Sequence, residues 1–124
     1  MDNAIKDSLK TILLSFDSVE FAYLFGSYAT GLISNHSDVD VAIFVKEGFD
    51  SFEVGLEVHH RLEVELLKEI DLLVLNDVKN NHLLKDIIYD GVLVKDSENR
   101  PMFEVRKQHE IIDFLDFRRM IDAA

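Results

Sequence analysis

The chain has 124 residues, of which 24 are acidic and 13 basic, for a formal net charge of −11. This length suits one hydrophobic core, so we expect a single domain over residues 1–124. The strong negative charge argues against direct nucleic-acid binding and favours a cationic partner or substrate.

Other features of the composition narrow the class of protein further. The sequence has no cysteine, which excludes disulfides and thiolate metal sites and is compatible with a reducing cytosol. No apolar run approaches the roughly 18 residues of a membrane span, and the first ten residues lack the layout of a signal peptide. We therefore expect a cytoplasmic protein that does not associate with membranes.

The first part of the chain predicts two helices and two strands. Apolar spacing predicts a helix over residues 2–16 that covers one face of a sheet. Residues 20–25 predict a short strand that leads into a glycine-serine pair, and residues 28–33 predict one or two helical turns that Gly31 ends. Residues 39–45 form an apolar run, which predicts a strand buried on both sides and exposed at one end.

The middle of the chain predicts a longer helix and a third strand. Ser51 is an acceptable cap for a helix that runs to about residue 68. Its expected apolar stripe consists of Phe52, Leu56, His59, Leu62 and Leu66. Residues 69–75 predict a strand in which Asp71 is the only acidic residue inside the apolar run. We expect this carboxylate to be buried and offset by a partner, because an unpaired buried charge is costly.

The last part predicts a helix, an edge strand and a charged helical tail. Asn76 or Asp77 can cap the helix, which Gly91 closes, and residues 92–94 predict the strand. Arg100 and Pro101 mark a break before the tail. Residues 102–124 then predict a C-terminal helix with apolar residues on more than one face, so we interpret it as a surface used for partner docking.

Two aspartates carry the chemistry that the sequence predicts. Asp38 and Asp40 alternate across one valine, so in a strand they lie on the same face about 6–7 Å apart. Such carboxylates favour a divalent cation, and Mg²⁺ is held by one or two carboxylates together with substrate phosphates. Ten residues upstream, Gly26 allows close approach of a phosphate to the backbone, and Ser27 can open a short helix. The pattern predicts a nucleoside-triphosphate and metal site.

One motif resembles that of the DNA polymerase β-like nucleotidyltransferase superfamily. It consists of Gly26-Ser27, an interval of ten residues, and Asp38-x-Asp40 before an apolar strand. At this length the chain resembles the minimal nucleotidyltransferases (MNT) of this superfamily, which pair with HEPN-domain toxins. The resemblance implies an α/β (α+β) fold with a small mixed sheet packed with helices. It also implies transfer of AMP from ATP to a hydroxyl of the toxin, which we expect to be that of a tyrosine. It implies two Mg²⁺ ions held by Asp38, Asp40 and Asp71, and a nucleotide bound by Gly26, Ser27 and Ser37.

The sequence departs from the family pattern in one respect and leaves alternatives open. Many relatives place an arginine after the glycine-serine pair, whereas residues 26–40 contain no Lys or Arg. Neutralisation of the triphosphate would then come from metals, backbone dipoles or distant cations such as Lys46 or Arg61. The alternatives are an aminoglycoside-type nucleotidyltransferase, and a non-catalytic antitoxin that acts by occlusion. A neighbouring gene for a HEPN protein would discriminate among the three.

Overall fold

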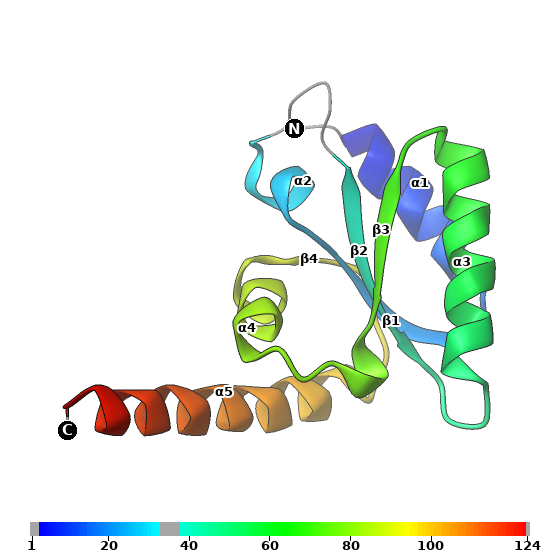
Figure 1. Cartoon of the computed structure of the whole chain (residues 1–124). Helices are drawn as coiled ribbons and strands as arrows, with labels where there is room; N and C mark the ends of the chain where they lie inside the picture. Colours follow the sequence, from blue (N-terminus) through cyan, green and yellow to red (C-terminus); the bar gives the residue numbers. More distant parts are fainter. Residues whose placement is uncertain (1–2, 33–37, 124) are drawn as a thin grey trace.

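The structure is a computed structural model that describes residues 3–32 and 38–123, and in it a four-stranded sheet lies between two layers of helices (Figure 1). In chain order the elements are α1 (Asn3–Leu14), β1 (Val19–Phe25), α2 (Ser27–Thr30), β2 (Val39–Val45), α3 (Ser51–Leu66), β3 (Ile70–Val74), η1 (Leu75–Asp77), α4 (Asn81–Asp90), β4 (Val92–Lys95) and α5 (Arg100–Ala123). The mixed α+β architecture confirms the predicted fold class.

The strand order is β3-β2-β1-β4, which places the two longest strands at the centre. β1 pairs antiparallel with β2 and with β4, whereas β2 and β3 run parallel. Helix α3 connects the parallel pair, as a crossover between parallel strands requires. β2 is buried along most of its length, as predicted, because it has a neighbouring strand on each side and helices on both faces.

Each face of the sheet has its own hydrophobic cluster. On one face, α1 and α3 contribute Leu9, Leu13, Val58 and Leu62 to a cluster that includes the inward side chains of β2. On the other face, α4 and α5 cover an aromatic group in which the rings of Phe21 and Phe44 stack with centroids 4.9 Å apart. Along the central strands, successive side chains point to opposite faces of the sheet, so alternate residues belong to the two clusters.

Helix α1 ends at Leu14, two residues before the predicted end. The Lys95 ammonium of β4 donates hydrogen bonds to the carbonyls of Leu13 and Phe16, at 3.2 and 2.8 Å. These carbonyls lie just where the helix leaves acceptors without partners, and a cation there is favourable. The edge strand therefore fixes the C-terminal end of α1.

Two predictions about α3 are wrong. Asp50 rather than Ser51 is its N-cap, since the Asp50 carboxylate accepts hydrogen bonds from the backbone N–H groups of Phe52 and Glu53. The first half of the predicted stripe is also wrong, because Phe52 is 71% exposed and Leu56 is 56% exposed, whereas Leu62 is buried and Leu66 packs against the core as predicted. The helix carries a second apolar row, Val54, Val58 and Leu62, which contacts the sheet instead.

The predicted cap of α4 is wrong for a similar reason. Asn80 caps this helix, and its side-chain oxygen accepts from the N–H groups of His82 and Leu83. Asn76 instead bonds to both backbone groups of Val45, each at 2.8 Å, and so holds the end of β2. Gly91 closes the helix as predicted, and β4 is an edge strand as predicted.

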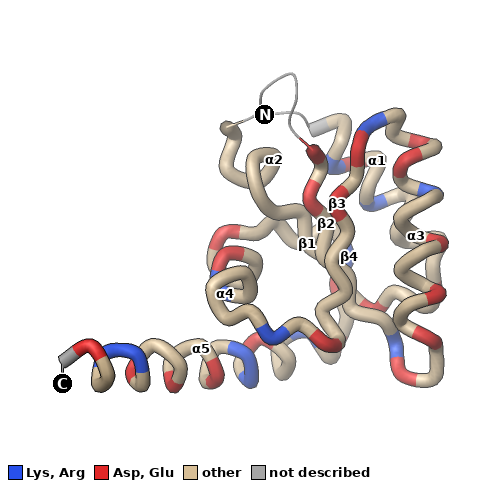
Figure 2. Tube along the Cα trace, in the orientation of Figure 1, with Lys and Arg blue, Asp and Glu red and all other residues tan. Residues whose placement is uncertain are grey.

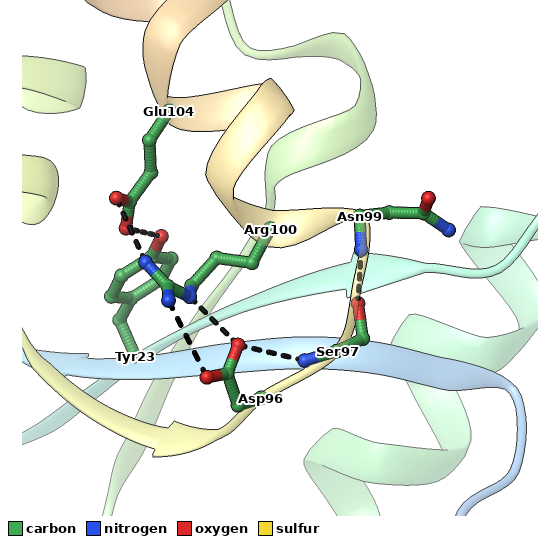
Figure 3. Close-up of polar contacts among 6 residues, drawn as sticks. All are labelled: Tyr23, Asp96, Ser97, Asn99, Arg100 and Glu104. Atoms are coloured by element: carbon green, nitrogen blue, oxygen red, sulfur yellow. Dashed lines mark hydrogen bonds and ion pairs between the residues drawn. The ribbon is translucent and has the colours of Figure 1, made fainter.

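Helix α5 begins at Arg100 rather than after a break, with Pro101 in its first turn, where proline is well tolerated. Figure 3 shows how this turn is attached: Arg100 pairs with Asp96 at 2.7 Å and with Glu104 at 3.0 Å, and the Tyr23 hydroxyl donates to Glu104. The far half of the helix extends away from the rest of the chain (Figure 1). No helix in the described ranges has the length and apolar character needed to cross a membrane.

Candidate active site

The turn between β1 and α2 is shaped by Gly26. Its φ of 70° and ψ of −148° belong to a region that residues with a side chain rarely adopt. A Cβ built on Gly26 would lie 2.1 Å from the Oδ2 atom of Asp40. The backbone of this turn therefore lies directly against the Asp40 carboxylate, and only glycine fits there.

Ser27 opens a single helical turn, as predicted. The N–H of Gly31 donates to the Ser27 carbonyl at 2.9 Å, and Gly31 ends the turn with a φ of 82°. The Ser27 side chain is half-buried, and its hydroxyl makes no hydrogen bond within residues 3–32 and 38–123. This hydroxyl is free to bind a ligand that reaches the turn.

The sheet register brings carboxylates from two strands together. Asp40 lies opposite Phe25 of β1 and directly beside Asp71 of β3 in the parallel pair. Asp38 immediately precedes β2 and, like Asp40, is half-buried. All three aspartates thus lie at the end of the sheet that carries α2, where Figure 2 shows acidic positions at the starts of β2 and β3.

This crowding changes the acidity of Asp40. Burial, repulsion from Asp71 and from Asp38, and a hydrogen bond that protonated Asp40 makes with Asp71 together raise its pKa from 3.8 to about 6. Like charges held close together disfavour ionisation of both. At neutral pH the carboxylates repel one another, so a cation bound between them would stabilise the cluster.

The structure places Asp71 beside Asp40 in the sheet, but the prediction that the Asp71 carboxylate is buried is wrong. Asp71 is exposed at the open end of β3, which is an edge strand. The apolar residues after it in β3 pack against the helices, whereas its own carboxylate faces solvent and needs no buried partner. The parallel register, rather than a cost of burial, brings Asp71 to Asp40.

The donor set fits Mg²⁺ in its chemistry. Within the described ranges, no group of three or more His, Cys, Asp or Glu side chains is placed so that the group could hold a metal ion by itself. Mg²⁺ does not need one, because it is usually held by one or two carboxylates with substrate phosphates and water. Asp40 and Asp71 carry hard oxygen ligands, and the backbone of Gly26 lies directly against the Asp40 carboxylate. Ser37, predicted to bind nucleotide, lies outside the described residues.

Neither of the distant cations suggested for the triphosphate lies at this site. Lys46 follows the last residue of β2, about 20 Å along the strand from Asp40. Arg61 pairs with Glu65 at 2.7 Å and lies 5.7 Å from the ring centre of Phe16, which precedes the start of β1. Lys46 therefore belongs to the opposite end of the sheet, and Arg61 is exposed on α3 and engaged by Glu65 and Phe16.

The sequence analysis missed a second feature at that opposite end. A cavity of about 880 Å³ opens between the end of β2 and the first turns of α5. Its lining includes Lys46, Phe44, Met102, Phe103, Arg106 and Lys107. No short motif signals it, because the two walls lie more than fifty residues apart in the sequence. The i, i+4 series Asp96, Arg100 and Glu104 was the available signal for the anchored start of α5.

Sequence comparison shows which protein family this chain resembles. Residues 7–100 match the family described as "Polymerase beta, Nucleotidyltransferase". A relative from Methanocaldococcus jannaschii, named as a protein adenylyltransferase, is 34% identical over 86 residues, which cover 68% of this chain and 86% of the relative. A second relative from the same organism, with the same name, is 36% identical over 86 residues.

Solved structures share the fold at low sequence identity. A toxin-antitoxin structure with AMP-PNP superimposes with a TM-score of 0.78 at 21% identity, over 95% of both chains. A chain from a complex of tri-AMPylated Shewanella oneidensis HEPN toxin with MNT antitoxin superimposes with a TM-score of 0.73 at 19% identity, over 99% of this chain and 97% of that one. From the family match over residues 7–100 and the relative at 34% identity, the chain belongs to the polymerase beta nucleotidyltransferase family.

Proposed function

We propose that this chain transfers AMP from ATP, with Mg²⁺, to a hydroxyl group of a partner HEPN toxin, most simply a tyrosine hydroxyl, and thereby acts as its antitoxin. The observation that carries the proposal is the contact of the Gly26 turn with Asp40, which the sheet register places beside Asp71. Relatives named as protein adenylyltransferases, and the fold shared with an antitoxin solved with its AMPylated toxin, support the choice of AMP and of a protein acceptor.

The residues of the chain act by position and by charge. Gly26 lets phosphate oxygens approach the backbone, and the unpaired Ser27 hydroxyl can donate to one of them. Asp38, Asp40 and Asp71 would hold Mg²⁺, which when bound stabilises charge on the phosphates and lowers the pKa of an attacking hydroxyl. Exposed Asp71 lies on the solvent side of the cluster, where the hydroxyl of a large protein acceptor can reach.

The test begins with the genes that neighbour this chain's own gene: a HEPN-domain protein identified there is purified and assayed as the acceptor of AMP. We expect a substoichiometric amount of the wild-type chain, with ATP and Mg²⁺, to add AMP to that protein. The intact mass of the acceptor protein detects the added AMP. Asp71→Asn should lower the rate about a hundredfold or more, since a metal ion contributes several kcal/mol to such a step. Because the Asp71 side chain is exposed, we expect Asp71→Asn to keep the wild-type fold, so that a lower rate reports on the transfer step.

A matched control is Asp77→Asn, which removes the same charge from the exposed turn after β3. This variant should transfer AMP at the wild-type rate. Neutralisation of the toxin by Asp71→Asn at equal amounts, without ATP, would instead establish occlusion. Transfer to an aminoglycoside but not to the HEPN protein would establish a small-molecule enzyme.

A further inference from the structure

The far half of α5 exposes large apolar side chains that nothing in the described chain covers. Phe117 is 60% exposed and Met120 is 72% exposed. The last firm contacts of the helix with the domain come earlier, where Ile111 is buried and Phe114 meets the ring of His82 in α4. With 24 residues the helix is about 36 Å long, so its last two turns project from the domain (Figure 1).

These side chains continue a row that starts in the cavity at the basic end of the sheet. Steps of three and four residues place successive side chains on one side of a helix. The row, here called the α5 stripe, consists of Met102, Arg106, Glu110, Asp113, Phe117 and Met120. All six are exposed, and the first two line the cavity. One continuous surface thus runs from the cavity to the tip of α5.

The inner end of this surface carries a small excess of positive charge in a chain that is otherwise acidic, because three cations, Lys46, Arg106 and Lys107, line the cavity with two acids, Glu20 and Glu47. Lys46 and Arg106 face the same cavity, and neither forms an ion pair within the described ranges. Lys107 also lines the cavity, pairs with Glu110 at 3.1 Å and lies 5.9 Å from the ring centre of Phe103. Beside the aromatic wall, the two unpaired cations suit a carboxylate next to an apolar group.

The order of chemistry along the stripe argues against a second copy of the chain as its occupant. It reads basic at Arg106, acidic at Glu110 and Asp113, and apolar at Phe117. If two copies of the stripe overlapped fully in antiparallel orientation, Glu110 of one copy would face Asp113 of the other. In parallel orientation, each charged residue would face the same residue of the other copy, so like charges would repel in both arrangements. Two chains of net charge −11 also repel each other. The surface therefore fits a different protein.

We propose that the cavity and the α5 stripe together form the docking surface for the protein that this chain modifies. The partner would offer a carboxylate to Lys46 and Arg106, a cation to Glu110 and Asp113, and an apolar side chain to Phe117 and Met120. The proposal rests on the proposed function for the identity of the partner. The cavity lies at the end of the sheet away from Asp40, so docking and chemistry use separate surfaces.

The experiment compares Phe117→Ala and Arg106→Glu with Ile112→Ala, a control on the same helix. Ile112 is 51% exposed and lies about 140° around the helix from Phe117. The probe is the same purified HEPN-domain protein that serves as acceptor in the transfer assay. We expect Phe117→Ala and Arg106→Glu to weaken its binding about tenfold or more, and Ile112→Ala to change it less than about twofold. KM for that protein should rise while kcat and the affinity for ATP stay unchanged.

The outcomes separate docking from chemistry. Equal binding by all three variants, or a melting temperature that falls together with affinity in Phe117→Ala, would overturn the docking surface. A chain that dimerises alone and becomes monomeric in Phe117→Ala would make a second copy the occupant and would also overturn it. Variant-sensitive binding with no AMP transfer by the wild-type chain would overturn the proposed function and leave the docking surface standing.

Discussion

The two ends of the central sheet carry opposite chemistry. At one end, the Gly26 turn lies against Asp40, and Asp38 and Asp71 crowd the same carboxylate. At the other end, unpaired Lys46 and Arg106 face a cavity with an aromatic wall. The carboxylates of the acidic end favour binding of a cation together with phosphates, whereas the cations of the basic end favour a carboxylate on a protein surface.

The difference between the ends is also one of construction. The acidic end is built mainly from one segment, in which a strand, a tight turn and the next strand return to the same edge. At the basic end, the network of Tyr23, Asp96, Arg100 and Glu104 holds the start of α5 to β1 and to the residue after β4 (Figure 3). The ring of Phe103 in α5 then contacts the ring of Phe44 in β2. A local motif therefore builds the first end and tertiary packing builds the second.

The largest effect should come from Gly26→Ala. The added Cβ would lie 2.1 Å from Asp40 Oδ2, so either the carboxylate or the turn must move. A displacement of about 1 Å at a reacting group costs about a hundredfold in rate. We expect AMP transfer to fall by at least that factor, and the free energy of unfolding to fall by about 1–3 kcal/mol because of the positive φ. Transfer assays and urea denaturation measure the two effects.

Gly48→Ala is the matched control from the basic end. Gly48 also has a positive φ, of 96°, but a Cβ there meets nothing within 4 Å. The variant should lose some stability through backbone strain and keep the wild-type kcat for transfer. If both alanine variants lose activity equally, backbone strain rather than the contact with Asp40 explains the effect, and the two ends of the sheet do not differ in the way described.

A smaller effect is expected in the pH dependence of stability. The folded chain holds the pKa of Asp40 at about 6, above its ordinary 3.8, so between these values the folded state binds more protons than the unfolded state. Stability of the metal-free chain therefore falls as pH rises from about 4 to about 6, and the loss remains at higher pH. Asp40→Asn should add about 1 kcal/mol at neutral pH, after allowance for solvent screening.

Urea denaturation in EDTA at several pH values measures this effect. Asp77→Asn, in an exposed turn, controls for the change in net charge and should keep the wild-type pH profile. An Asp40→Asn variant that is less stable than wild type at neutral pH would show that Asp40 has a structural role in the folded chain. Mg²⁺ with ATP should remove the wild-type loss, because a bound cation offsets the repulsion.

The sequence predicted the acidic end well because its pattern is short. Gly26, Ser27, Asp38 and Asp40 lie within fifteen residues, and a glycine before a helical turn has few other structural explanations. The structure places Asp71 beside Asp40, but burial was the wrong reason to single it out, because the parallel register of β3 with β2 cannot be read from the apolar run alone. Periodicity identified the existence of every strand and every α-helix.

Other features depended on competition between neighbouring residues. Asp50 and Ser51 are both good caps, and only the path of the chain into α3 decides between them. In the same helix two apolar rows compete, and packing on the sheet selects the row of Val58. The cavity at the basic end could not be predicted at all, since it requires Arg106 and Lys46 to meet across sixty residues of sequence.

The smallest expected effect is that of Tyr23→Phe, which tests how α5 is held at the basic end. The Tyr23 hydroxyl donates to Glu104, and burial together with the neighbouring Glu104 raises the pKa of Tyr23 well above its ordinary value. The hydroxyl therefore stays protonated and acts only as a donor. Its loss leaves Glu104 paired with Arg100 at 3.0 Å, so we expect a stability loss of only about 0.5 kcal/mol.

The corresponding double change separates the network from the hydroxyl itself. Arg100→Ala alone should cost more than Tyr23→Phe, because it leaves Asp96 and Glu104 without their cation. In Tyr23→Phe combined with Arg100→Ala, the partly buried Glu104 carboxylate has neither partner, so the combined loss in urea denaturation should exceed the sum of the single losses. Simple additivity would mean that the two contacts hold α5 independently, and that Glu104 does not link helix to strand.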